Sequence, residues 1–81
     1  MENIISIEYC EPCNYQETAA NLAREIQDQF GKQVTKVILS PNKSIGSCEI
    51  TIDQELIFSK KDSGRFPRPG EIIQLIMMRI Y

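Results

Sequence analysis

The sequence predicts an α+β domain in which two helices cover a four-stranded mixed sheet, in the order β-α-β-β-β-α. Three observations support this fold class. Apolar residues alternate with period two in several short segments, they recur at helical spacing in two longer ones, and turn residues separate the segments. No repeat, linker or shift in composition divides the 81 residues, so we expect one domain over residues 1–81.

The first two predicted elements differ in their hydrophobic period. Alternating apolar and polar residues predict a strand over residues 5–9, and helical spacing predicts a helix over residues 15–30. Pro12 suits the first turn of this helix, and Gly31 suits its end. The helix is predicted from apolar residues that recur at helical spacing, which are Tyr15, Ala19, Leu22, Ala23, Ile26 and Phe30.

The second half of the chain predicts three strands and a helix. A β-branched strand over residues 34–39 ends at the turn-rich stretch "SPNKSIGS", and strands over residues 48–52 and 55–59 form a hairpin with its turn at residues 53–54. After the polar stretch "KKDSGRFPRPG", a helix with Pro69 near its start is predicted from a further apolar stripe, formed by Ile72, Ile73, Ile76, Met77 and Ile80.

Topology predicts that three distant loops meet at one edge of the sheet. A right-handed β-α-β crossover makes the first two strands parallel, so "CEPC" and "SPNKSIGS" both follow strands that end at the same edge. The third strand descends and the fourth returns, which brings "SKKDSGRF" to that edge as well.

Composition limits the classes of function. Nine basic and eleven acidic residues give a net charge of -2, so we expect neither nucleic acid nor a membrane surface as a partner. The chain has no apolar run long enough for a transmembrane helix, and its start lacks the pattern of a secretory signal. Three cysteines are an odd number for a disulfide scaffold, so we expect a soluble, cytoplasmic protein.

Cys10 and Cys13 form a CxxC motif between the first strand and the first helix. Unsatisfied N–H groups at a helix start favour a thiolate, and two sulfurs at this spacing can form and resolve a disulfide. A structural zinc site usually needs four ligands, and the chain has one such pair and no histidine. Redox chemistry is the favoured interpretation, with a metal site and ordinary buried cysteines as the alternatives.

Charged residues near the pair are expected to modulate it. Glu11 lies between the cysteines and disfavours a thiolate, while Pro12 stiffens the ring that a disulfide would close. We hypothesise that Lys60, Lys61 or Arg65, in the loop that topology brings to this edge, offsets the charge of Glu11.

Two further residues each allow two interpretations. Cys48 has the parity of Ile50 and Ile52, so it is expected to pack in the core, with a role as a third redox sulfur as the alternative. Phe66 is expected to pack its loop onto the domain, and the alternative is that it docks a partner.

Three stretches carry a resemblance to a known family, and they are "IEYCEPCNYQETAANLAREI", "VILSPNKSIGSCEI" and "LIFSKKDSGRFPRPGEI". They resemble the selenoprotein W-like family, also called Rdx or SelT/SelW/SelH-like, in its cysteine-containing bacterial form. The resemblance implies a thioredoxin-like fold and thiol redox chemistry linked to glutathione or protein thiols. In the selenoenzymes of the family, selenocysteine takes the position of Cys13, whereas thioredoxin analogy makes Cys10 the attacking thiol. Which sulfur attacks therefore stays open here.

The chain departs from the pattern of this family at some positions. Cys48 stands where the family tends to have an aromatic residue, and Gln54 takes a hairpin position where glycine is common. No proline immediately precedes Cys48, so the cis-proline of thioredoxins is not evident, and substrate recognition is assigned instead to Ile45 and Gly46 with "SGRF".

Two function classes follow. The first is a small thiol-disulfide oxidoreductase or antioxidant protein of cell redox homeostasis, with Cys10 and Cys13 as its catalytic residues, no tightly bound cofactor and glutathione as a candidate reductant. The second is a redox-responsive interaction module without turnover, so enzyme status stays open. Partners are expected to be protein thiols or glutathione, and the chain is expected to be a monomer or weak homodimer.

Overall fold

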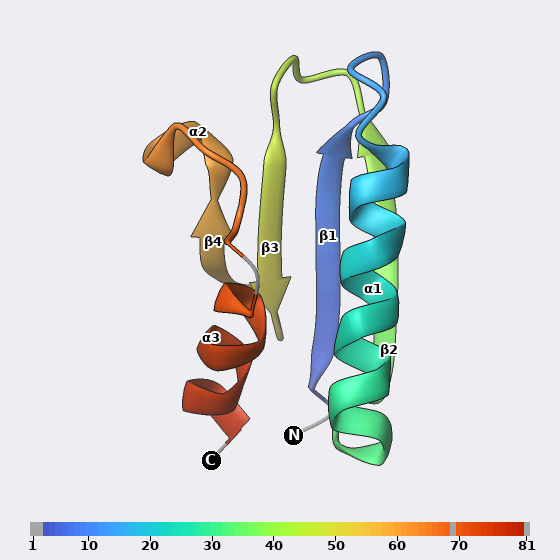
Figure 1. Cartoon of the computed structure of the whole chain (residues 1–81), viewed down its shortest axis with the longest axis vertical. Helices are drawn as coiled ribbons and strands as arrows, with labels where there is room; N and C mark the ends of the chain where they lie inside the picture. The colour runs from blue at the N-terminus through green and yellow to red at the C-terminus, as the bar shows by residue number, and fades with distance from the viewer. Residues whose placement is uncertain (1–2, 69, 81) are drawn as a thin grey trace.

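A computed structural model describes residues 3–68 and 70–80 and shows a mixed four-stranded sheet with both long helices on one of its faces (Figure 1). This is the α+β architecture that the sequence predicts. The elements in chain order are β1 (Ile4–Cys10), α1 (Gln16–Phe30), the 3-10 turn η1 (Gly31–Gln33), β2 (Lys36–Asn42), β3 (Cys48–Ile52), β4 (Glu55–Ser59), α2 (Lys60–Ser63) and α3 (Glu71–Ile80).

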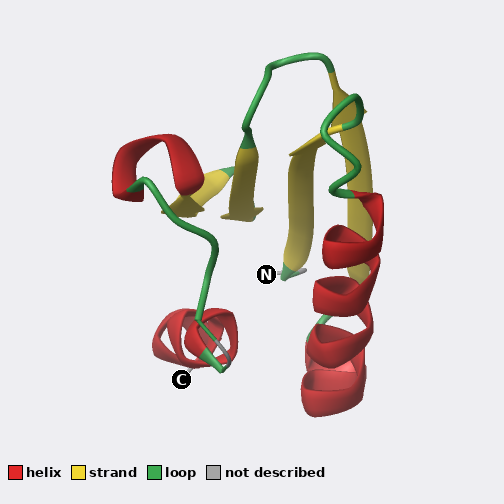
Figure 2. Cartoon of the chain, turned by 45° about the horizontal axis from the view of Figure 1, so that its top comes forward, coloured by secondary structure: helices red, strands yellow, loops and turns green. Residues whose placement is uncertain are grey.

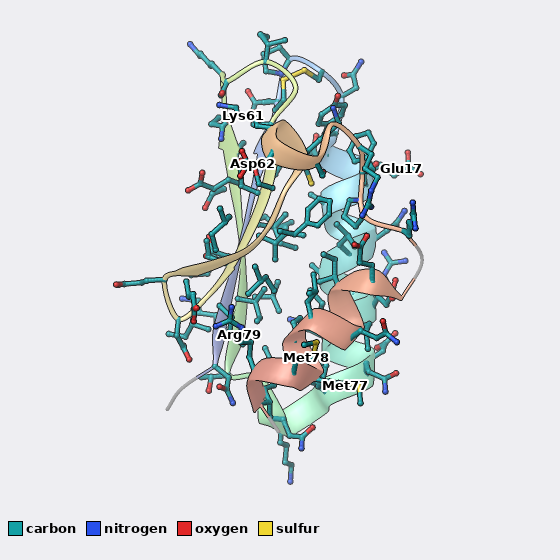
Figure 3. All side chains as sticks on the ribbon, turned by 90° about the vertical axis from the view of Figure 1, so that its left-hand side faces the viewer. Glu17, Lys61, Asp62, Met77, Met78 and Arg79 are labelled. Atoms are coloured by element: carbon teal, nitrogen blue, oxygen red, sulfur yellow. A yellow bond between two sulfur atoms is a disulfide. The ribbon has the colours of Figure 1, made fainter. Side chains whose placement is uncertain are left out.

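The strands lie in the order β2-β1-β3-β4. β1 and β2 are parallel, and β3 is antiparallel to both β1 and β4, so the predicted pairing is confirmed. Seen edge-on, the sheet forms one layer and α1 and α3 form the other, with apolar side chains filling the space between them (Figure 3). α1 returns the chain to the start of β2, as the parallel pairing of β1 and β2 requires.

The core is built from the inward positions of the central strands and one stripe of each long helix. Ile5, Ile7 and Ile50 are fully buried, and each contributes about 1.5–3 kcal/mol through loss of contact with water. The helices add Ala19, Ile26, Phe30, Ile72 and Ile76. The period-two and helical patterns therefore identify the buried faces of β1, β3 and α1 correctly.

Two element boundaries differ from the prediction. α1 begins at Gln16, so Pro12 lies in the turn before the helix and not in its first turn. β2 begins at Lys36, which leaves Val34 outside it, and continues through Pro41, which pairs with Tyr9. β2 is an edge strand, and one side of it has no neighbouring strand. Proline is tolerated in such a strand, because on that side its missing N–H removes no hydrogen bond of the sheet.

The β3–β4 hairpin turns at Asp53 and Gln54, as predicted. Their φ angles of 49° and 73° are both positive, which is the signature of a type I′ turn. The Asp53 carboxylate also accepts a hydrogen bond from the Ile4 N–H at 2.9 Å, which ties this turn to the start of β1.

The polar stretch after β4 contains the short helix α2, which the hydrophobic pattern could not reveal. The Ser59 hydroxyl accepts a hydrogen bond from the Asp62 N–H and caps its start, and Gly64 at φ 72° ends it. In α3, Met77 is 41% exposed and does not belong to the buried stripe, whereas Leu75 packs against the core. Pro69 lies outside the described residues.

No helix in the described ranges, 3–68 and 70–80, is long and apolar enough to cross a bilayer.

Candidate functional site

Cys10 and Cys13 are joined by a disulfide at the end of β1. Cys10 is the last residue of the strand, and the chain then turns over residues 11–14, where the Asn14 N–H donates to the Glu11 carbonyl at 3.1 Å. Pro12 occupies the second position of this turn, where its fixed φ angle is favourable. The Cα atoms of the two cysteines are 5.3 Å apart, a distance typical of disulfides.

The two cysteine residues differ in their exposure to solvent. Cys10 is the last residue of a central strand and is 0% exposed. Cys13 lies in the turn that follows and is only half-buried. Access to a bridged pair is therefore through Cys13. Because α1 begins at Gln16, neither cysteine lies at the helix start that sequence reasoning assumed.

The β2–β3 loop lies beside the CxxC turn (Figure 2). The Cys10 N–H donates to the Ser47 carbonyl at 3.0 Å, and the Glu11 N–H donates to the Asn42 carbonyl at 2.9 Å. The Gly46 N–H donates to Cys13 Sγ at 3.3 Å. Two of the three loops predicted to meet at this edge are therefore in direct contact.

The third loop reaches the same edge through an aromatic contact. The ring of Phe66 packs edge-on against that of Tyr15, just after the CxxC turn, with ring centroids 4.7 Å apart. The Lys60 ammonium lies 5.1 Å from the Phe66 ring and 5.6 Å from the Tyr15 ring. Phe66 is still 37% exposed, so it packs its loop onto the domain without being enclosed. The predicted convergence of the three loops is confirmed.

The three cations proposed to offset Glu11 have different environments. The Arg65 guanidinium makes a bidentate ion pair with Glu71, at 2.7 and 2.9 Å, and also donates to the Phe66 carbonyl. The hydrogen bonds from Arg65, together with one from the Arg68 N–H, lower the pKa of Glu71 to about 2. Arg65 is thus held away from a free role at the thiols, and offset by Lys60 or Lys61 stays a prediction.

Cys48 is a free thiol and is 1% exposed, which confirms the packing interpretation. Burial raises the pKa of its thiol, the nearby Glu49 carboxylate raises it further, and Lys60 acts in the opposite direction. Its partner in the sheet register is Tyr9 and not Cys10.

The described part of the chain holds no group of three or more cysteine, aspartate or glutamate side chains arranged to bind a metal ion. The contact at the candidate site that sequence reasoning missed is the hydrogen bond from the Gly46 N–H to Cys13 Sγ. The topology already predicted that "SPNKSIGS" lies next to "CEPC". The direction in which a single peptide N–H points cannot be predicted from the spacing of residues in the sequence, so the hydrogen bond itself was not predicted.

Comparison with known proteins places this geometry in context. A sequence model of the Rdx family matches residues 4–78. Two curated relatives, both called Migration and invasion enhancer 1, are 34% identical in Bos taurus and 30% identical in Mus musculus, over 89% of this chain. The chain spans 60% of the length of those relatives.

Two bacterial crystal structures share the fold. A selenoprotein W-related protein from Vibrio cholerae has a TM-score of 0.94 and 28% sequence identity, with 100% of each chain covered. A protein from Bordetella parapertussis has a TM-score of 0.92 and 25% identity, with 98% of this chain and 99% of the other covered.

Proposed function

The chain belongs to the Rdx family, and from this premise we propose that it is a small thiol-disulfide redox protein in which Cys10 and Cys13 alternate between dithiol and disulfide. The observation that carries the proposal is the Cys10–Cys13 disulfide itself, in which Cys13 is partly exposed and Cys10 is fully buried. A pair with this asymmetry suits disulfide exchange, because the first attack needs access and the second needs only proximity.

The difference in exposure supports Cys13 as the attacking sulfur. The Cys13 thiolate attacks one sulfur of a substrate disulfide, forms a mixed disulfide and releases the other substrate sulfur as a thiolate. The Cys10 thiolate then attacks Cys13 Sγ, releases the second substrate thiolate and closes the Cys10–Cys13 disulfide. The substrate gains two electrons and two protons in total, and the pair loses them.

Glutathione or a protein dithiol is the proposed reductant that restores the pair. Two glutathione molecules supply the two electrons and leave as glutathione disulfide, so no tightly bound cofactor is required. We also propose a cytoplasmic location, because the cytosol maintains the pool of reduced thiols that this step consumes. The proposed oligomeric state is a monomer or weak homodimer.

The test is reduction of a protein or low-molecular-weight disulfide, coupled to glutathione and glutathione reductase. We expect turnover by the wild type, none by Cys13→Ser, and a trapped mixed disulfide on Cys13 in Cys10→Ser. Cys48→Ser is the matched control and should retain turnover, because Cys48 is buried and outside the pair. Undiminished turnover by Cys13→Ser would sink the proposal.

The contact between the β2–β3 loop and Cys13 favours a second candidate, a redox-responsive interaction module. Opening the disulfide alters the sulfur that Gly46 contacts, so the surface of that loop can report the redox state. This function predicts partner binding that differs between oxidised and reduced protein, in the absence of turnover in the coupled assay.

A further inference from the structure

The Gly46 N–H points at the accessible sulfur of the pair. Its nitrogen lies 3.3 Å from Cys13 Sγ, across a sequence separation of 33 residues. In the disulfide this is a weak contact with a neutral sulfur. After reduction the same donor faces a thiol that reacts only as its thiolate, and a hydrogen bond to an ionised group is roughly twice as strong as one to a neutral group.

The local backbone explains why this N–H points outward from its own turn. The Ser47 N–H donates to the Ser44 carbonyl at 3.1 Å and closes a turn over residues 44–47. Gly46, at the third position, has φ 80°, whereas Ile45 does not have a positive φ, and this φ pattern matches a type II turn. Glycine is the residue that adopts this conformation without steric cost, so the turn depends on it.

Asn42 holds the turn in place from both sides. Its side-chain oxygen accepts hydrogen bonds from the Ser44 N–H at 3.0 Å and from the Ser47 hydroxyl at 2.9 Å. Its backbone carbonyl accepts from the Glu11 N–H at 2.9 Å, so the same residue is bonded to the CxxC turn. Ser47 is buried, and its hydroxyl has this partner within the described structure.

Within residues 3–68 and 70–80, no charged side chain at this edge is hydrogen-bonded to Cys13 Sγ. Glu11 on the CxxC turn disfavours a thiolate, and Lys43 on the β2–β3 loop is exposed. On the third side, the Lys60 ammonium lies against the rings of Tyr15 and Phe66. Arg65, also on that side, is paired with Glu71. The hydrogen bond that the structure shows to Cys13 Sγ is donated by the backbone N–H of Gly46.

We propose that the Gly46 N–H stabilises the Cys13 thiolate and that Asn42 is the positioning residue that holds this N–H on the sulfur. The inference rests on the proposed function and assigns the group that prepares Cys13 for its attack. During that attack the hydrogen bond weakens as the sulfur loses its charge to the new sulfur–sulfur bond. It strengthens again when reductant returns Cys13 to its thiolate state.

The direct test removes the Gly46 N–H and leaves every side chain around it in place. The chain is assembled by native chemical ligation of residues 1–47 to residues 48–81, because Cys48 provides the ligation site. Gly46 is replaced by glycolic acid, so an ester oxygen stands in place of the N–H. The Cys10→Ser background leaves Cys13 as the accessible thiol, and its alkylation by iodoacetamide is followed at the peptide level by mass spectrometry across pH.

The ester protein is expected to need a higher pH for half-maximal alkylation than the amide protein. At pH 7 the thiolate fraction should fall about tenfold, the loss expected for one charge-assisted hydrogen bond. Identical pH profiles for the ester and amide proteins would overturn the proposal. Circular dichroism of both proteins verifies that the fold is retained.

The role of Asn42 is tested separately with Asn42→Ala, in the same background. This variant should shift the alkylation profile in the same direction as the ester, while Asn21→Ala, an equal change on the exposed face of α1, should leave it unchanged. An unshifted Asn42→Ala profile beside a shifted ester profile overturns the positioning role alone. Alkylation needs no substrate turnover, so a shifted profile without disulfide reductase activity would refute the proposed function and leave this inference standing.

Discussion

The contact between Tyr15 and Phe66 can be measured by a double-mutant cycle. The two rings join the loop after α2 to the segment after the CxxC turn, so they secure the third side of the site. The perturbations are Tyr15→Leu, Phe66→Leu and the double variant. Leucine retains much of the apolar volume and removes the aromatic ring.

The geometry sets the expected magnitude. Centroids at 4.7 Å and an interplanar angle of 72° define an edge-to-face pair, which contributes about 0.5–1.5 kcal/mol beyond its buried area. The Lys60 ammonium near each ring adds about 0.5–1 kcal/mol at such partly exposed positions. Phe66→Leu should therefore lower the free energy of unfolding by about 1–2.5 kcal/mol, and the coupling between the two substitutions should be about 0.5–1.5 kcal/mol.

The assay is guanidinium unfolding of the oxidised protein, with the free energy of unfolding extrapolated to water for all four proteins. A second cycle, Tyr15→Leu with Phe30→Leu, is the control, because Phe30 lies at the far end of α1. Its substitutions should be additive within about 0.3–0.5 kcal/mol. Equal additivity in the Tyr15–Phe66 cycle would show that the rings do not fix this loop at the redox site.

Three further predictions concern the turn, the ion pair and the free thiol. Gln54→Gly should raise the free energy of unfolding by about 0.5–1 kcal/mol in thermal or guanidinium unfolding, because Gln54 holds φ 73°; a loss of stability would contradict the type I′ turn. Since the pKa of Glu71 is about 2 in the folded state and lies below its unfolded value, its contribution is present above about pH 4.5 and is lost as pH falls toward 2. Glu71→Gln should therefore be less stable than the wild type at pH 7 and approach it near pH 2, and a gap that is constant with pH in unfolding curves would refute the ion pair with Arg65. Cys48 should resist iodoacetamide at pH 8 in the native protein and react once unfolded, because burial raises its thiol pKa; fast native labelling detected by mass spectrometry would contradict its packing.

Much of the fold was determined by residues that act locally. Period-two alternation placed β1 and β3, the turn at residues 53–54 placed β4 as the second arm of a hairpin, and the helical stripe placed the body of α1 up to its stop at Gly31. These patterns are reliable because each reports which side of a segment faces the core. Three errors lie where apolar periodicity is absent, at the edge residue Pro41, at the polar helix α2 and in the turn that contains Pro12. A fourth lies within a periodic segment, because Met77 has helical spacing but is exposed.

The pairing of Cys10 with Cys13, and the meeting of three loops at one edge, also followed from the sequence. The spacing of the cysteines limits what they can do, and the handedness of the β-α-β crossover fixes which strand ends lie together. Cys48 was placed in the core by its parity with Ile50.

Only the tertiary structure decided how these parts interact. It buried Cys10 and left Cys13 accessible, paired Arg65 with Glu71, and directed the Gly46 N–H at Cys13 Sγ. The physical reason is that accessibility and hydrogen-bond direction depend on the packing of loops distant in sequence and on the rotation of a single peptide plane. Neither quantity leaves a periodic trace along the chain.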